Sequence, residues 1–197
     1  MATKLEFAKY KLTAASIQWW DEKSQKHTTG TKFGCLGSLT AEPDVNTITI
    51  DCEGEENDSV DVVRFLELTI LAHTNMANRR KIFGLNGDGL KEGYFGNDYR
   101  NVQGEGILTC ELEDLYGRET LMIAFPRVKF TGGFRFEHEN GQNEIAELEF
   151  NAKAYPVEFN GIKRHYIEVA KSVLGKENVT KWHTAFVPTL VEGTPLV

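Results

Sequence analysis

The sequence has few of the features that mark membrane or secreted proteins. No apolar run approaches the roughly 20 residues that a membrane-spanning helix needs. The N-terminal segment MATKLEFAKYKL lacks a hydrophobic signal core, because Glu6, Lys9 and Lys11 interrupt its apolar residues. We therefore expect no membrane segment, and synthesis and residence in a cytoplasm.

Cysteine and histidine are too few and too irregularly spaced to form a recognisable site. Cys35, Cys52 and Cys110 include no CxxC pair, which argues against a disulfide framework and a zinc site. We expect all three to be buried thiols. The five histidines show no HxH, HxxxH or HExxH spacing. The sequence predicts no metal site and no cofactor.

Catalytic motifs are also missing. No serine lies in a G-x-S-x-G elbow, and the glycines at 87, 89 and 93 have the wrong spacing for a dinucleotide fingerprint. Carboxylate pairs such as Glu111 and Glu113 alternate with apolar residues, which is typical of a solvated strand face. We predict no catalytic residue, and an enzyme on a β scaffold is the weakest of three functional hypotheses.

Positive charge is in short supply. The chain has 22 Lys and Arg against 29 Asp and Glu, which gives a formal net charge of −7 and argues against tight binding to phosphates. Its hydrophobic fraction of 41% and charged fraction of 26% are typical of globular chains. At 197 residues it fits one domain with extensions.

The clearest pattern runs from Leu121 to Phe159. Its last third alternates strictly, as in a half-buried strand. One face carries Ala146, Leu148, Phe150, Ala152 and Ala154, and the other carries Glu147, Glu149, Asn151 and Lys153. Strands are also expected at Leu121–Phe130 and Phe134–Glu139, with glycine turns at 131–133 and 140–142. The pattern indicates an antiparallel meander.

The first half also reads as β structure. Tyr10–Trp20 predicts a strand in which one of the two adjacent tryptophans is buried and the other exposed. Pro43-Asp44 signals a turn, and Val45–Cys52 indicates either an edge strand or a projecting hairpin. The acidic segment from Glu53 to Asp58 is expected to be an exposed, solvated loop. A loop through which rings of subunits stack is the second interpretation, and a cation site is the third. The strongest strand is Val60–Ala72, where Val60, Val62, Leu66, Leu68 and Ile70 share a face that only Arg64 breaks.

Helical signals are local. TNMANRRKIFG predicts a short helix with Thr74 or Asn75 as N-cap, a stop at Gly84, and a buried stripe of Met76, Ala77, Ile82 and Phe83. The segment 162–173 predicts a second helix that stops at Gly175, with a strand through His165 to Val169 as the competing interpretation. From Lys176 onward we expect a tail that packs on something other than its own core.

The segments LGSLTAEP, DVVRFLELTILAH, RVKFTGGFRF and IAELEFNAKAYP, in this order, resemble the tail tube (major tail) proteins of long-tailed, non-contractile bacteriophages and related tailocins. The resemblance covers roughly residues 10–160 and rests on the order of elements. It implies a mainly β (α+β) fold, an antiparallel β-sandwich or barrel with one short flanking helix and a C-terminal extension. In that family six copies join into rings, and the rings stack into a viral tail tube, the conduit for DNA during ejection.

The resemblance also implies sites and partners. We expect an N-terminal arm at 1–9, a tail-tube-like domain at 10–160, and an extension at 161–197 that contacts neighbouring subunits. The inter-subunit residues would be Glu53, Glu55, Glu56 and Asp58. The face with Glu147, Glu149, Asn151 and Lys153 would line the lumen or an interface. The partners would be copies of the same chain, tape-measure and tail-terminator proteins, with DNA passing unbound through a tail assembled in the bacterial cytoplasm.

A hypothesis of another class stays open. The chain could be a monomeric β-sandwich that binds a ligand or carbohydrate through Trp19 or Trp20 and the glycine-rich loop between residues 85 and 106.

Overall fold

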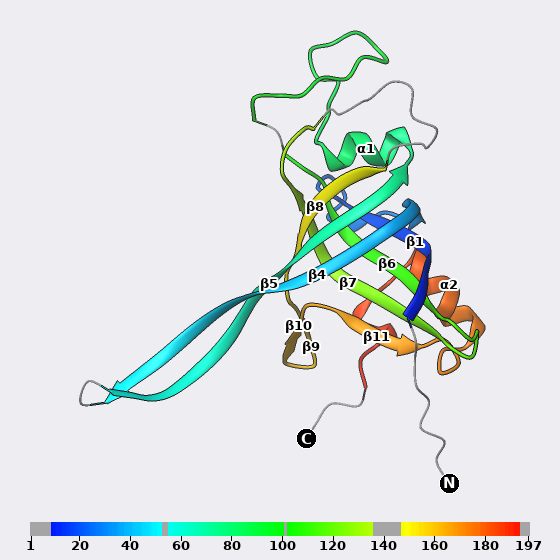
Figure 1. The fold of residues 1–197 in the computed structure, drawn as a ribbon. Helices are drawn as coiled ribbons and strands as arrows, with labels where there is room; N and C mark the ends of the chain where they lie inside the picture. The colour runs from blue at the N-terminus through cyan, green and yellow to red at the C-terminus, as the bar shows by residue number, and fades with distance from the viewer. Residues whose placement is uncertain (1–8, 53–54, 101, 136–146, 194–197) are drawn as a thin grey trace.

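The computed structural model describes residues 9–52, 55–100, 102–135 and 147–193, with the side chains of 9–10, 50–52 and 55–58 left undescribed. The described chain is mainly antiparallel β structure, which confirms the expected fold class (Figure 1). The strands are β1 Lys9–Asp21, β2 Lys26–His27, β3 Thr31–Lys32, β4 Gly34–Cys52, β5 Glu55–Thr74, β6 Glu105–Asp114, β7 Thr120–Thr131, β8 Leu148–Ala154, β9 Val157–Phe159, β10 Ile162–Arg164 and β11 Ile167–Ala170. The helices are α1 Met76–Ile82, α2 Lys176–Thr184 and a 3-10 turn, Pro188–Leu190.

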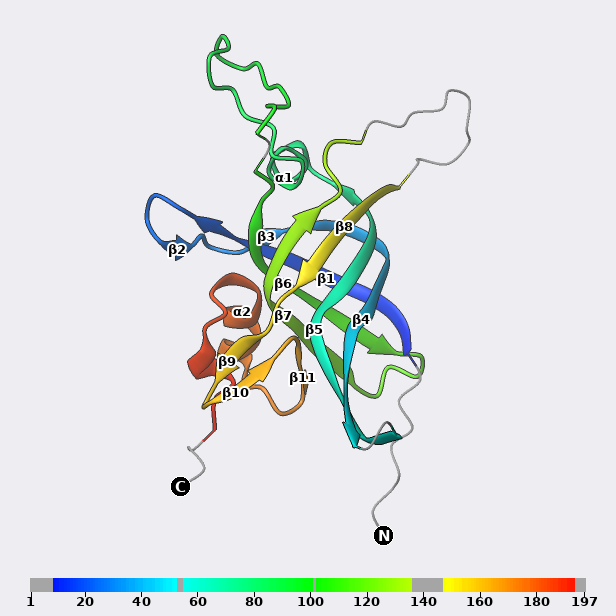
Figure 2. The ribbon, with the colours of Figure 1, turned by 90° about the vertical axis from the view of Figure 1, so that its left-hand side faces the viewer.

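The main sheet curls because its central strand, β7, pairs along one edge with a different strand in each half of its length. Its order is β2-β1-β6-β7-β8-β5-β4, with β3 added to β1 and β11 added to β7. The first half of β7 pairs with β11, and its second half, from Val128, pairs with β8. Pro126 lies between these two pairings, where its missing N–H costs no ladder hydrogen bond. The strands therefore wrap around an interior in two crossing groups (Figure 2).

Aromatic side chains fill that interior. Phe33 stacks on Phe130 with a centroid separation of 6.2 Å, and Trp19 packs on Phe130 at 5.5 Å. Phe150 from β8 meets Phe33 edge to face. The alternation expected for β8 is confirmed, because Phe150 and its even-numbered neighbours 152 and 154 are buried while 149 and 151 are exposed.

The helix expected after β5 is confirmed as α1. Asn75 is its N-cap and accepts a hydrogen bond from the Asn78 N–H at 2.8 Å, and Gly84 follows it with φ of 63°. The predicted buried stripe is partly wrong, because Met76 and Ala77 are exposed. Asn78 is buried instead: its side-chain oxygen accepts from Trp19 Nε1 at 3.1 Å.

The predicted meander needs one correction. Phe134 and Arg135 belong to no strand, and β8 pairs directly with β7. The rest of the expected strand Phe134–Glu139, and the turn at 140–142, lie outside the described residues.

The helix predicted at 162–173 is wrong, and the competing strand interpretation is closer. Asn160 and Gly161 have φ of 48° and 79°, which turns the chain into the β9–β10 hairpin. Ile167 and Val169 then pair with β7, so that cross-strand packing prevails over the helical spacing. Gly175 is the N-cap of α2 and not the end of a helix.

The C-terminal segment packs on its own sheet, which corrects the expectation of a tail that packs elsewhere. Trp182 is fully buried on the outer face of β6 and β7, together with Phe186, Ile107 and Met122. Gln18 holds this segment: its Nε2 donates to the Trp182 carbonyl at 3.3 Å, and its Oε1 accepts from the Phe186 N–H at 2.9 Å. The described part of the extension at 161–197 thus completes a second apolar layer.

Candidate functional site

A long two-stranded arm projects from the body (Figure 1). Among the described residues, β8 pairs with β5 only at Leu66–Ala72, and beyond that point β4 and β5 pair with each other alone. We call residues 45–63 the arm. Eight residues of β4 lie beyond Asp44, which at about 3.3 Å per residue gives a reach of about 26 Å. Of the two arrangements expected for Val45–Cys52, the structure shows the projecting hairpin.

A β-bulge marks the base of the arm. Asp44 pairs with Phe65 and Val45 pairs with Val63, which leaves Arg64 as an extra residue. The turn predicted at Pro43-Asp44 is therefore wrong, because both residues continue β4. The Arg64 guanidinium donates to both carboxylate oxygens of Asp44, at 3.0 and 2.9 Å.

The bulge gives the arm one apolar and one polar face. An extra residue reverses the alternation of a strand. Val60 and Val62 therefore lie on the face opposite the buried Leu68 and Ile70, and the sequence-based prediction that all four share one face is wrong. Ile48 opposes Val60, and these two are each 51% exposed while Val62 is 43% exposed. We call Ile48, Val60 and Val62 the apolar stripe.

At the base of the arm the other face carries Val45 opposite Val63, and farther out it is polar. Thr47 opposes Asp61 and donates a hydrogen bond of 2.6 Å to its carboxylate, and Thr49 opposes Ser59. A two-stranded ribbon with one wet face and one solvent-exposed apolar face is only marginally stable in water. Such a ribbon gains stability when another surface covers the stripe.

The negative charge of the chain is concentrated on and beside the arm. No Lys or Arg occurs from Phe33 to Val63, whereas eight Asp and Glu lie between Glu42 and Asp61. Subtracting those eight charges from the formal net charge of −7 leaves +1 for the rest of the chain. The molecule is therefore electrically polarised, with an acidic arm on a nearly neutral body.

The predicted inter-subunit residues belong to this arm. Glu53 lies outside the described residues. The backbones of Glu55, Glu56 and Asp58 belong to β5, which corrects the exposed loop expected there. Their side chains are not described.

The predicted lumen or interface face lies on β8. Glu149, Asn151 and Lys153 project from the sheet into solvent, and Glu147 immediately precedes the strand. Charges of both signs lie close together on this face. Lys153 Nζ lies 3.8 Å from Glu67 of the neighbouring strand β5, and Arg135 lies 3.6 Å from Glu149. This face is wet, as expected, and its charges are mixed.

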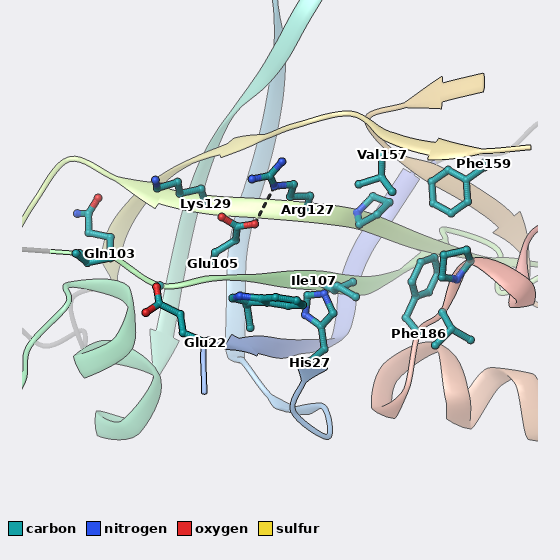
Figure 3. Close-up of a pocket in the computed structure, with 16 residues that line it drawn as sticks. Glu22, His27, Gln103, Glu105, Ile107, Arg127, Lys129, Val157, Phe159 and Phe186 are labelled. Atoms are coloured by element: carbon teal, nitrogen blue, oxygen red, sulfur yellow. Dashed lines mark hydrogen bonds and ion pairs between the residues drawn. The ribbon is translucent and has the colours of Figure 1, made fainter. Parts of the chain in front are cut away.

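A groove of about 800 Å³ opens on the outer face of β6 and β7, beside the area that α2 covers (Figure 3). Ile107 lies in its floor, between His27 on one side and Phe159 and Phe186 on the other. Arg127 and Lys129 stand on its rim, and Arg127 Nε donates to Glu105 at 2.8 Å.

Trp20 also lines the groove, where it is 37% exposed and meets the His27 ring edge-on at 5.0 Å. Trp19 is buried, so the prediction of one core and one surface tryptophan is confirmed. No other pattern in the sequence indicated the groove, because Phe159 and Phe186 reach it from distant segments. The adjacent tryptophans were the available signal.

A buried polar cluster fixes the C-terminal segment on β6. Glu111 accepts two hydrogen bonds from Lys171 Nζ, at 2.8 and 2.7 Å, and lies 3.3 Å from His183 Nε2. Thr109 Oγ1 lies 3.1 Å from His183 Nδ1. The solvated strand face predicted for Glu111 is therefore wrong, because α2 and the end of β11 cover it.

The same burial makes the C-terminal anchor sensitive to pH. Burial lowers the pKa of His183 below its ordinary value of 6.5, although Glu111 partly opposes this shift. The unfolded chain therefore binds a proton more readily, and we expect the free energy of unfolding to fall as pH drops below about 6.5. Urea unfolding at pH 7.5 and 5.5 measures this loss.

Two variants separate the contribution of His183. The pKa of His27 is also lowered by burial, so both histidines act in the same direction. We expect His183→Gln and His27→Gln each to lose part of the pH dependence, and equal slopes in His183→Gln and the parent would contradict the assignment.

The two cysteines with described side chains differ. Cys110 is buried, and this burial raises the pKa of its thiol to about 12, with a smaller contribution from the negative charge of Glu111. Cys35 is exposed, which corrects the expectation of a buried thiol. The side chain of Cys52 is not described.

Within the described ranges, no three His, Cys, Asp or Glu side chains gather where they could hold a metal ion. No helix in the same ranges is long and apolar enough to cross a membrane. No protein-family model matches the sequence, and no curated protein matches it. The arm, the wet face of β8 and the groove are therefore the features from which function can be inferred.

Proposed function

We propose that this protein is a structural subunit of a phage or tailocin tail tube, in which copies form hexameric rings that stack into the conduit for DNA. The observation that carries the proposal is the arm. Its apolar stripe is exposed, and no third strand among the described residues pairs with the ribbon that carries it. Fully burying an exposed aliphatic side chain contributes about 1.5–3 kcal/mol, and these three side chains, which are about half exposed, would each gain roughly half of that on a partner surface.

The wet face of β8 fits the inside or the flank of such a tube. Carboxylates such as Glu147 and Glu149 repel phosphates at close range, where a Debye length of about 8 Å screens them only in part. Lys153 and Arg135 moderate this repulsion. DNA would then pass without specific binding, and the tube ends would meet tape-measure and tail-terminator proteins. The role is structural and needs no active site or cofactor.

The groove favours the second candidate, a monomeric ligand- or carbohydrate-binding module. Trp20 offers part of an aromatic face beside apolar floor residues, and sugars stack on such faces. In this candidate the arm would have no partner of its own kind.

Electron microscopy of the purified protein separates the two candidates. We expect rings or tubes in negative stain, and more of them as protein concentration rises. A strictly monomeric species at high concentration, with no tubes at any salt concentration, would contradict the tail-tube proposal and leave the binding module.

A further inference from the structure

We infer that the arm of one copy docks in the groove of a second copy, with the apolar stripe on the groove floor. This inference rests on the proposed self-assembly and specifies the contact that drives it. The stripe has no partner within the described residues of its own chain, and the groove presents exposed apolar side chains at Trp20, Val102 and Val187 above a floor that is itself buried.

The charge distribution favours contact between an arm and a body. Two arms that met each other would bring together two segments with six acidic residues and no basic residue each. Like charges at such a contact oppose association, whereas removing the six acidic residues of the arm from the formal net charge of −7 leaves only −1 for the rest of the chain. The arm therefore selects a different part of the neighbouring molecule.

The groove has the matching chemistry. Its apolar floor, with Ile107 and Phe186, continues the layer that α2 covers farther along the same strands. The rim has mixed charge, with Arg127 and Lys129 beside Glu22 and Glu105. Arg127 is already paired with Glu105, so Lys129 is the cation that a carboxylate of an incoming arm would approach. Aliphatic side chains such as Ile48 and Val60 suit a floor of this kind.

The arm cannot fill the groove of its own chain. It continues β4 and β5, which end the sheet order, and leaves the body as a straight ribbon (Figure 1). The groove lies on the outer face of β6 and β7, between β2 and β9 (Figures 2 and 3). Each copy thus presents one donor and one acceptor, a heterologous contact that closes into a ring or continues as a filament.

Two complementary variants of the full chain test the contact. The donor variant carries Ile48→Thr, Val60→Thr and Val62→Thr, which removes the apolar stripe and keeps the charge and β propensity. The acceptor variant carries Lys129→Glu and Val187→Glu, both at exposed positions on the groove. Val173→Glu with Lys176→Glu is the matched control, since it makes the same changes at exposed positions away from the groove.

We expect each variant alone to be monomeric in analytical ultracentrifugation, with self-association weakened by at least about tenfold. An equimolar mixture should form a heterodimer and nothing larger, because one intact stripe meets one intact groove. The control should assemble like the parent protein. Circular dichroism verifies folding, and Val187→Glu alone replaces the acceptor variant should the double change unfold it.

Other outcomes identify which idea fails. An acceptor variant that assembles like the parent overturns the groove as the docking site, and one that stops at a symmetric dimer indicates contact between arms. Head-to-tail association of the parent without tubes would leave the inference standing and remove the tail-tube function. If the parent and the acceptor variant both form tubes, the tail-tube function would stand and the docking of the arm in the groove would be overturned.

Discussion

Replacing residues 45–64 with Asn-Gly is expected to abolish self-assembly and leave the body folded. The replacement joins Asp44 to Phe65, which already oppose each other, through a two-residue turn suited to a β-hairpin. It removes the apolar stripe and six acidic residues. None of the buried core residues belongs to the removed segment, so we expect the free energy of unfolding to change by less than about 1 kcal/mol.

Negative-stain microscopy and urea unfolding measure these two effects on one sample. Thr49→Ser is the control, because it alters the polar face of the arm and keeps the stripe, and it should assemble normally. Tubes from the truncated chain would show that the arm is dispensable. A truncated chain that fails to fold would show that the arm supports the body.

Trp182→Ala is expected to cost about 3–5 kcal/mol of unfolding free energy, the range for removing a large buried aromatic side chain. Trp182 is fully buried, packs edge to face on Phe186 at 5.0 Å, and donates from Nε1 to the Ile123 carbonyl at 3.2 Å. Its loss leaves a cavity between α2 and the outer face of β6 and β7.

Urea unfolding checks this value against Val173→Ala, a change at a side chain that is 75% exposed and should cost less than about 0.5 kcal/mol. A cost of under about 1 kcal/mol for Trp182→Ala would mean that the C-terminal segment is only loosely attached. The expected larger cost makes residues 161–193 a part of the folding unit, so their removal would destabilise the body before it affected contacts with any neighbouring copy.

Local patterns predicted the elements whose determinants lie close together in the chain. The strict alternation around Phe150 identified the buried face of β8, and Asn75 with Gly84 set the limits of α1. Both depend on a few consecutive residues. The mainly β fold with a short helix could therefore be predicted from the sequence.

Features that depend on distant residues could not be predicted in this way. Glu111 looks like a solvated strand residue until Lys171 and His183 cover it. Likewise, Trp182 and Phe186 gain their buried place from Gln18, at the other end of the chain. The groove joins five segments of the chain, so no single stretch of sequence revealed it.

The side to which the apolar face of the arm turns also could not be predicted, because a one-residue shift in strand pairing does not change the residue types of the strand. Arg64 looked like a break in an apolar face. In the structure it is the extra residue of a bulge, held by Asp44. The apolar face of the arm therefore turns to a side that the simple alternation did not predict.

The bulge at Arg64 is the pivot about which the arm would rotate relative to the body. Bulges raise the local twist of a hairpin, and the Arg64 contact with Asp44 clamps the arm where it leaves the body. Over a reach of about 26 Å, a rotation of about 10° at the pivot would carry the far end of the arm through about 5 Å, roughly the spacing of neighbouring strands. The direction of the arm is thus set by Arg64, the inserted residue, and by the carboxylate of Asp44. These two residues also set the angle between successive copies in any assembly built through the arm.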